Sequence, residues 1–228
     1  MIMIPAAAFV LCILGMVLQA TFIAVEHDKK MVPAVILKGS ASVVFVIIGS
    51  IAFGKCINTS FGRMVLIGLI CGALGDILLN LRYLSEKNAQ KIFLAGIAVF
   101  FAGHIMYLAA LIPLSRNLLL SFVIGVICAA CLLAYIFTKL KIKVAFKIFG
   151  IFYIGAIVVM TAVAIGNLLA APESACIMFA IGAVLFTISD VVLIFNTFGD
   201  KTTFSRRIVN LSCYYVAQLL IACSVFLI

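Results

Sequence analysis

Two aspartates, Asp76 in "LGDILL" and Asp190 in "ISDVVL", lie several residues inside long apolar stretches. An ionised Asp at the centre of a membrane helix costs about 3 kcal/mol even on low scales, so each side chain should face protein rather than lipid. Buried carboxyl groups mark ion pathways and sites of proton transfer, and they also hold helices together. From these residues alone, an enzyme, a transporter and a purely structural polar cluster all remain open interpretations.

Other polar side chains interrupt further apolar stretches. Lys38 occurs in "VILKGSAS" and His104 in "FFAGHIMY", while Tyr214 and Gln218 share "CYYVAQLLI". Because side chains three or four positions apart share a helix face, His104 lies beside Tyr107, and Tyr214 lies beside Gln218. These residues and the two aspartates form the candidate site.

The composition indicates which kind of secondary structure carries these candidate residues. The chain is 67% hydrophobic and 10% charged, with a mean hydropathy of +1.40, which is typical of an integral membrane protein. Apolar runs of about 18 to 24 residues match the length of a membrane-spanning helix, and barrel-type alternation is absent. We predict one all-α, polytopic transmembrane domain over residues 1–228, with its helices in one bundle. The eight predicted helices span residues 4–25, 32–53, 64–81, 92–112, 118–138, 145–170, 174–196 and 208–228.

The distribution of basic residues predicts the topology. The formal net charge is +9, and twelve Lys and Arg residues fall in the connections after the first, third, fifth and seventh helices, against three in the other connections. On the positive-inside rule, both termini lie outside the cytoplasm of a plasma membrane, the inner membrane in a bacterium. Because the cations sit singly or in small groups at helix ends, we expect no nucleic-acid partner.

This topology places the polar residues at similar depths. Counted from the cytoplasmic helix ends at 1.5 Å per residue, they lie about 8 to 18 Å deep. In order of increasing depth they are Lys38, Asp76, Tyr214, Asp190, Gln218 and His104. The sequence therefore predicts one cavity that opens toward the cytoplasmic leaflet.

The spacing of these residues also raises the question of an internal repeat. Asp76 precedes His104 by 28 positions, Asp190 precedes Gln218 by 28, and the two halves are offset by 114 positions. One interpretation is a parallel four-plus-four repeat, in which the third and fourth helices match the seventh and eighth. The other is chance similarity between apolar helices.

The order and spacing of five segments resemble a known family. They are "LKGSAS", "GDILL" with the following "RYL", "FLAGIAVFFAGHIMY", "SDVVLIF" and "YYVAQLLI". Together they are similar to the YhhN family of membrane lysoplasmalogenases, also called alkenylglycerophosphocholine or alkenylglycerophosphoethanolamine hydrolases. A G-H-x-x-Y helix between two Asp-bearing helices, followed by Y-x-x-A-Q, carries most of the resemblance. The family usually has Pro after the Lys of the second helix, where this chain has Gly39.

The resemblance implies hydrolysis of the sn-1 vinyl ether of a lysoplasmalogen to a fatty aldehyde and glycerophosphoethanolamine or glycerophosphocholine. Protonation of the β-carbon of the vinyl ether gives an oxocarbenium ion, water adds, and the hemiacetal collapses. This chemistry needs a protonated acid and a carboxylate, much as glycosidases use a carboxyl pair. Asp76 and Asp190 would be that pair, with either residue in either role.

The resemblance also implies roles for the other polar residues. They would orient water or substrate oxygens, or meet the lipid phosphate near the leaflet surface. The orienting residues would be His104, Tyr107, Tyr214 and Gln218, and the phosphate-binding residues Lys38 or Arg82. The implied partners are a vinyl-ether lysophospholipid and membrane lipid, with no cofactor, no metal and no obligate protein partner.

Three alternatives stay open. The main one is a proton- or cation-coupled transporter, because buried Asp residues also mark ion pathways. A divalent metal held by Asp76, Asp190 and His104 is chemically feasible, although the proposed chemistry needs none. The polar cluster could instead be structural, with each interhelical hydrogen bond worth roughly 0.6 kcal/mol. The absence of G-x-S-x-G and H-E-x-x-H disfavours a serine esterase and a zinc hydrolase.

Overall fold

Eight α-helices account for most of the structure, a computed structural model that describes residues 4–228 apart from the side chains of Glu86 and Ala145. They are α1 (Ala6–His27), α2 (Met31–Phe53), α3 (Thr59–Leu81), α4 (Ala89–Leu111), α5 (Leu118–Lys139), α6 (Val144–Ala170), α7 (Ser174–Phe198) and α8 (Phe204–Ser224). All eight are long and apolar enough to cross a bilayer, and residues 4–228 contain no strand. The predicted all-α, eight-span architecture is confirmed, while residues 1–3 of the predicted domain lie outside the described part.

Two helices begin four or five residues earlier than the hydropathy pattern predicts. α3 begins at Thr59 rather than at residue 64, because the Asn58 side chain accepts a hydrogen bond of 3.1 Å from the Phe61 backbone N–H. α8 begins at Phe204 rather than at residue 208, and the Thr203 hydroxyl caps it. Several cations assigned to connections from the sequence lie in helices, namely Arg63 in α3, Lys91 in α4, Lys139 in α5, Lys147 in α6, and Arg206 and Arg207 in α8.

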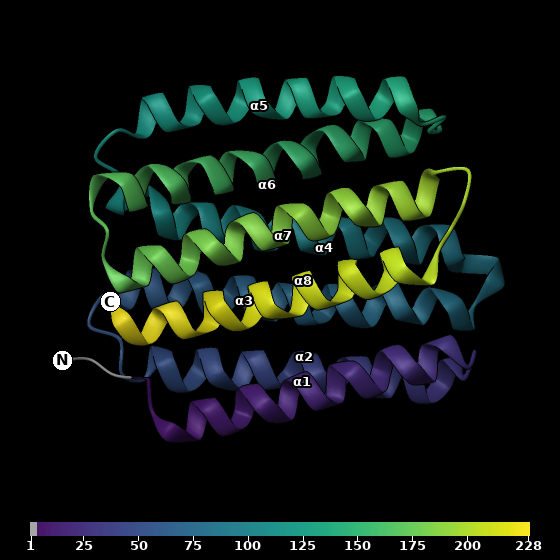
Figure 1. Ribbon diagram of the computed structural model, residues 1–228, viewed down its shortest axis with the longest axis horizontal. Coiled ribbons are helices and arrows are strands. Elements are labelled where there is room, and N and C mark those ends of the chain that lie inside the picture. The colour runs from purple at the N-terminus through teal and green to yellow at the C-terminus, as the bar shows by residue number, and fades with distance from the viewer. Residues whose placement is uncertain (1–3) are drawn as a thin grey trace.

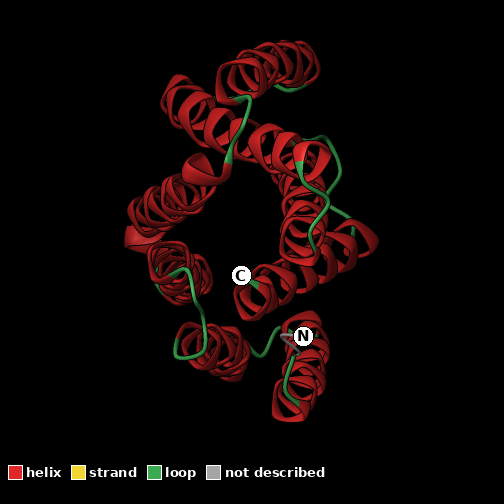
Figure 2. Cartoon of the chain, turned by 90° about the vertical axis from the view of Figure 1, so that its left-hand side faces the viewer, coloured by secondary structure: helices red, strands yellow, loops and turns green. Residues whose placement is uncertain are grey.

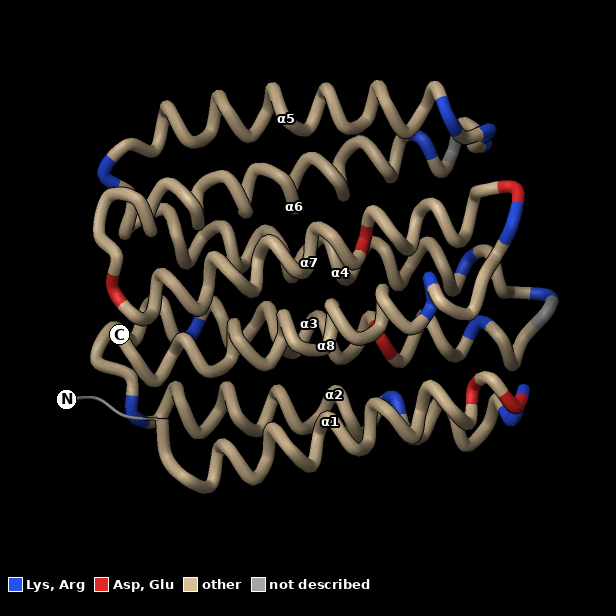
Figure 3. Tube along the Cα trace, in the orientation of Figure 1, with Lys and Arg blue, Asp and Glu red and all other residues tan. Residues whose placement is uncertain are grey.

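The helices run up and down, side by side (Figure 1). α1 packs on α2 and α8 at one edge, and α5 packs against α6 at the opposite edge. Figure 2, viewed along the helices, shows the elongated cross-section, with α1 and α2 at the bottom and α5 at the top. The start of α1 and the C-terminal residue lie at one end of the bundle, and most Lys and Arg residues gather at the other end (Figure 3). We refer to the latter as the basic end.

The hydrophobic core lies between the inner helices. Among its fully buried side chains are Phe45 of α2, Leu69 of α3, Met160 of α6 and Phe179 of α7. α3 packs along α4, and α7 along α8, the two pairs that a parallel repeat would equate. The repeat itself stays a prediction.

Two glycines on α3 allow polar side chains to approach that helix closely. A Cβ atom at Gly68 would overlap the Tyr107 ring of α4, and a Cβ atom at Gly72 would overlap the Gln218 amide of α8. Glycines four positions apart are a common device for close packing between membrane helices. Here they make room for side chains that support the candidate site.

Candidate active site

Asp76 lies at the centre of a buried cluster that joins α2, α3 and α8. Its Oδ2 atom accepts hydrogen bonds from the Ser42 hydroxyl at 2.5 Å and from the Tyr214 hydroxyl at 2.7 Å. The ammonium Nζ of Lys38 lies 3.4 Å from its Oδ1 atom. Hydrogen-bond donors and a cation both favour the charged form of a carboxyl group, so these contacts stabilise Asp76 as a carboxylate.

The Lys38 side chain is 1% exposed, and its ammonium group finds three kinds of partner. Besides Asp76, it donates a hydrogen bond of 3.2 Å to Gln19 Oε1 on α1, and it lies 4.5 Å from the centroid of the Tyr214 ring. Because the pair is shielded from water, removing either charge would leave the other without compensation. Lys38 therefore compensates the negative charge of the Asp76 carboxylate.

A chain of hydrogen bonds supports Tyr214 from behind. The Tyr107 hydroxyl on α4 donates to Gln218 Oε1 at 2.7 Å, and Gln218 Nε2 donates to the Tyr214 hydroxyl at 3.2 Å. Tyr107 and Gln218 are fully buried and do not line the cavity that contains Asp76. Their contacts hold Tyr214 in position.

Asp190 on α7 has different surroundings. Its Oδ2 atom accepts a hydrogen bond of 2.6 Å from the hydroxyl of Tyr153 on α6. No Lys or Arg side chain within residues 4–228 lies within ion-pair distance of Asp190. The two buried carboxyl groups are therefore unequal: Asp76 has a cation and two hydroxyl donors, whereas Asp190 has one hydroxyl donor.

Both aspartates line one polar cavity between α2, α3, α4, α6, α7 and α8, with an empty volume of about 530 Å³ that is partly open. Its other polar lining residues are Lys38, Asn80, Arg82, Tyr153, Arg207, Asn210 and Tyr214. Five residues selected from the sequence thus meet around one space, namely Lys38, Asp76, Arg82, Asp190 and Tyr214.

The polar cavity continues toward the basic end of the bundle. A wider opening there shares Arg82, Leu193 and Arg207 with it. The Arg207 guanidinium is bound by both carboxylate oxygens of Glu26, at 2.7 and 2.9 Å, so its charge is compensated. Arg82 instead stacks over Phe93, 4.3 Å from the ring centroid, and donates a hydrogen bond of 2.7 Å to the Tyr83 hydroxyl. Neither of these two partners carries a negative charge.

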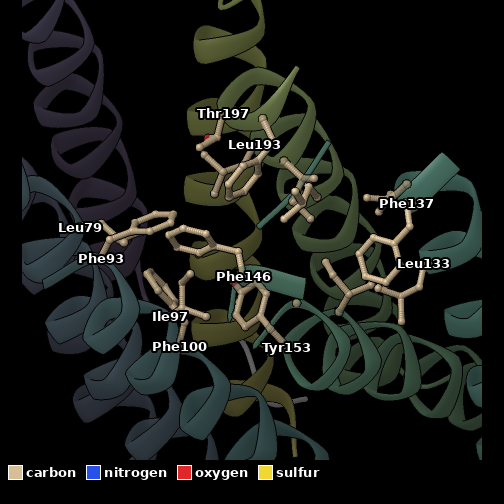
Figure 4. A pocket seen from close by; sticks show the side chains of 16 residues that line it. Leu79, Phe93, Ile97, Phe100, Leu133, Phe137, Phe146, Tyr153, Leu193 and Thr197 are labelled. Atoms are coloured by element: carbon tan, nitrogen blue, oxygen red, sulfur yellow. The ribbon is translucent and has the colours of Figure 1, made fainter. Parts of the chain in front are cut away.

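An apolar cavity adjoins the polar one on the side of α5 and α6 (Figure 4). The two cavities share Leu79, Phe93, Phe100, Tyr153 and Leu193. The apolar cavity is partly open, has an empty volume of about 690 Å³ when the open space is included, and continues between α4, α5, α6 and α7. The site is thus polar at one end and apolar at the other.

His104 lines neither cavity. Its Nδ1 atom lies 2.7 Å from the Phe100 carbonyl oxygen, to which it must donate, and its ring contacts Phe186 and Tyr153 edge-on. Its Nε2 atom is buried without a hydrogen-bond partner in the described part of the chain. Within residues 4–228, no three His, Cys, Asp or Glu side chains form a metal-binding group, so Asp76, Asp190 and His104 are not assembled as ligands.

Several site residues were missed from the sequence. Ser42 follows Lys38 by four positions and so shares its helix face, and Gln19 is a lone amide in an apolar helix; both were detectable signals. Tyr153 gave a weaker signal, because an aromatic residue fits an apolar run without its hydroxyl. Asn210 is held by reciprocal hydrogen bonds with Ser189, which only the packing of α7 on α8 reveals.

Comparison with known proteins assigns the chain to a family. A sequence model of the YhhN family matches residues 34–225. The matched region runs from α2 to the turn after α8, so it includes both aspartates and every residue that lines the polar cavity. No curated protein and no solved structure matched the chain.

Proposed function

The chain belongs to the YhhN family, and we propose that it is an ether hydrolase that cleaves the sn-1 vinyl ether of lysoplasmalogens. The products are a fatty aldehyde and glycerophosphoethanolamine or glycerophosphocholine. The observation that carries the proposal is that two buried carboxyl groups with unequal partners line one cavity near the basic end. An acid and a carboxylate in one water-restricted space meet the needs of vinyl ether hydrolysis.

The different partners of Asp76 and Asp190 indicate which residue is the acid and which is the base. Asp190 has no cation within ion-pair distance in the described residues and one hydroxyl donor, so it serves as the protonated acid. Asp76 is held as a carboxylate by Lys38, Ser42 and Tyr214, so it serves as the base. Pairs of carboxyl groups whose environments differ in this way are typical of acid/base sites.

The reaction balances with these two groups and one water. Asp190 transfers its proton to the β-carbon of the vinyl ether, where the electron pair of the double bond forms the new C–H bond. This leaves Asp190 as a carboxylate and an oxocarbenium ion shared by the α-carbon and the ether oxygen. Asp76 steadies this cation and takes a proton from the water that attacks the α-carbon. The resulting hemiacetal gives its hydroxyl proton to Asp190 as the C–O bond to glycerol breaks, and Asp76 returns its proton to the glycerol oxygen.

The head group is assigned to the open end of the polar cavity. Arg82 lies where the polar cavity meets the opening at the basic end, and its contacts with Phe93 and Tyr83 bring it no opposite charge. A guanidinium group presents several donors to a phosphate, which makes Arg82 the phosphate ligand in this proposal. Lys38 is committed to Asp76 and is not assigned that role.

We place the basic end in the cytoplasm of a plasma membrane and both termini outside it. The asymmetry of Lys and Arg between the two ends supports this orientation (Figure 3). A reporter that is active only outside the cytoplasm should be active when it is fused after Ile228. Activity of a cytoplasmic reporter at the same position would reverse the orientation.

The experiment that tests the proposed function separates it from a proton- or cation-coupled transporter. Purified protein in detergent, where no gradient exists, should release aldehyde from a lysoplasmalogen. A transporter would be inert in detergent and would move its substrate only across sealed vesicles. Exhaustive treatment with a chelator should leave aldehyde release unchanged, and loss of activity that an added divalent metal restores would require a metal in the mechanism.

A further inference from the structure

The apolar cavity meets the polar cavity close to Asp190. Tyr153 stands at the junction: its hydroxyl donates to Asp190, while its ring forms part of the apolar wall. In Figure 4 the side chains of α3 and α4 face those of α5 across this space. A molecule that extends from Asp190 into the apolar cavity therefore passes no charged group.

Arg82 lies where the charged head group of an amphiphile could bind. Arg82 stacks on the Phe93 ring at 4.3 Å, and Phe93 lines both cavities. Phe93 in turn packs against Phe146 of α6, with 5.7 Å between the ring centroids. The order from the opening inward is thus a cation, an aromatic boundary and an apolar space, which is the order of a phosphate head group followed by a hydrocarbon chain.

One glycine keeps part of this cavity open. On α6 the lining residues Phe146, Gly150, Tyr153 and Ile154 follow the spacing of a single helix face. A Cβ atom at Gly150 would meet no atom within 4 Å, so the missing side chain leaves empty space along this face. A glycine inside a helix is less favourable than alanine by about 1 kcal/mol, which calls for a local reason to have it there.

We propose that the apolar cavity binds the single hydrocarbon chain of a lysolipid and that Gly150 sets the space available to this chain. The inference rests on the proposed function for the identity of the substrate. The new elements are the position of the hydrocarbon chain in the protein and the residue that selects for the length of that hydrocarbon chain. Side chains larger than glycine at position 150 should exclude long chains first, because they narrow the cavity beyond the site of bond cleavage.

Gly155 provides a matched control on the same helix. A Cβ atom at Gly155 also meets no atom within 4 Å, but this residue does not line the apolar cavity. It follows Gly150 by five positions and so lies on another face of α6. Leucine at either position should be accommodated by the helix, and only leucine at 150 should enter the cavity.

A binding experiment can test the inference without any turnover. The chain contains no Trp, so a Phe137→Trp variant reports from the cavity wall without background emission. The probe is an ester lysophosphatidylcholine with a dibrominated chain, which quenches tryptophan on contact. We expect saturable quenching in Phe137→Trp, its loss after the added Gly150→Leu substitution, and its retention after Gly155→Leu. A Phe9→Trp variant, on the exposed surface of α1, measures non-saturable quenching by the surrounding detergent.

Turnover with substrates of graded chain length completes the test. Gly150→Leu should lower kcat/KM at least tenfold for long alkenyl chains and much less for short ones, while Gly155→Leu should leave the profile unchanged. Gly150→Val provides a smaller obstruction in case the leucine variant does not fold. Absent saturable quenching, or equal effects of the substitutions at 150 and 155, would overturn the inference. If quenching is saturable and depends on Gly150 but the protein releases no aldehyde, the apolar cavity binds the hydrocarbon chain of a lysolipid and the proposed hydrolysis is refuted.

Discussion

The hydroxyl of Tyr214 lies 2.7 Å from Oδ2 of Asp76, although 138 positions separate the two residues. This contact joins the last helix to the third, and Ser42 of α2 donates to the same carboxylate oxygen. Asp190 also has a tyrosine partner, Tyr153 at 2.6 Å, but no cation comparable to Lys38 in residues 4–228. The two carboxyl groups thus share one kind of partner and differ in charge compensation, which is the basis for their separate roles.

The Tyr153→Phe substitution should lower kcat severalfold with little change in the folded structure. It removes the hydroxyl that positions Asp190, and a hydrogen bond to a protonated, neutral carboxyl group contributes about 0.5 to 1.5 kcal/mol. Aldehyde release under saturating substrate measures the effect. The matched control is Tyr135→Phe, at an exposed tyrosine of α5, which should retain full activity. Full activity of the Tyr153→Phe variant would show that this hydroxyl has no part in catalysis.

The Lys38–Asp76 pair should show strong coupling in stability. Lys38→Met leaves a buried carboxylate without its cation and should destabilise the protein by about 3 to 5 kcal/mol. Adding Asp76→Asn removes the remaining charge and should restore part of that loss. Unfolding of the two single variants and the double variant in detergent gives the coupling energy. Purely additive losses would mean that the two charges do not compensate each other.

The Gly72→Ala substitution should disturb the site from outside the cavity. The added methyl group would overlap the Gln218 amide, which then could not keep its hydrogen bond to Tyr214. Because overpacking a close contact costs about 1 to 3 kcal/mol, we expect lower thermal stability together with a severalfold lower kcat. Gly155→Ala, which adds a methyl group in open space, is the control. Equal behaviour of the two variants would remove the supporting role assigned to Gln218.

The Arg82→Gln substitution should act on substrate binding rather than on turnover. Loss of the guanidinium should raise KM about tenfold for a phosphate-bearing lysoplasmalogen and leave kcat nearly unchanged. With an alkenylglycerol that lacks the phosphate, the variant and the unmodified protein should have equal KM values. Arg116→Gln, at the opposite end of the bundle, is the control. An equal rise in KM for both substrates would remove the phosphate-binding role of Arg82.

The sequence predicted the eight helices well, because continuous apolar runs leave little choice in a bilayer. The helix starts at Thr59 and Phe204 were missed, since side-chain caps rather than hydropathy determine them. Asp76 and Asp190 were conspicuous as charges in apolar surroundings, and topology indicated their shared depth. Their partners Tyr153 and Tyr214 became clear only from the packing of helices distant in sequence.

Some roles implied by the resemblance take a different form in the structure. His104, Tyr107 and Gln218 lie behind the cavity rather than on its surface. The sequence shows which residues are polar and on which helix face they lie, but it does not show which of two buried layers they occupy. The apolar cavity was also not predictable, because its lining residues are indistinguishable from ordinary core residues until the helices are placed.

Vinyl ether hydrolysis by Asp76 and Asp190 is best tested by aldehyde release from a lysoplasmalogen, measured beside fatty-acid release from the corresponding ester lysophospholipid. We expect the unmodified protein in detergent to form aldehyde and to leave the ester intact. Asp76→Asn and Asp190→Asn should each lower aldehyde release by about 10² to 10⁴ while remaining folded, as expected for loss of an acid or base. The control Asp200→Asn, in the connection between α7 and α8, should be fully active. If the unmodified protein forms no aldehyde, the chain is not a lysoplasmalogenase. If both aspartate variants are fully active, Asp76 and Asp190 are not the acid and the base.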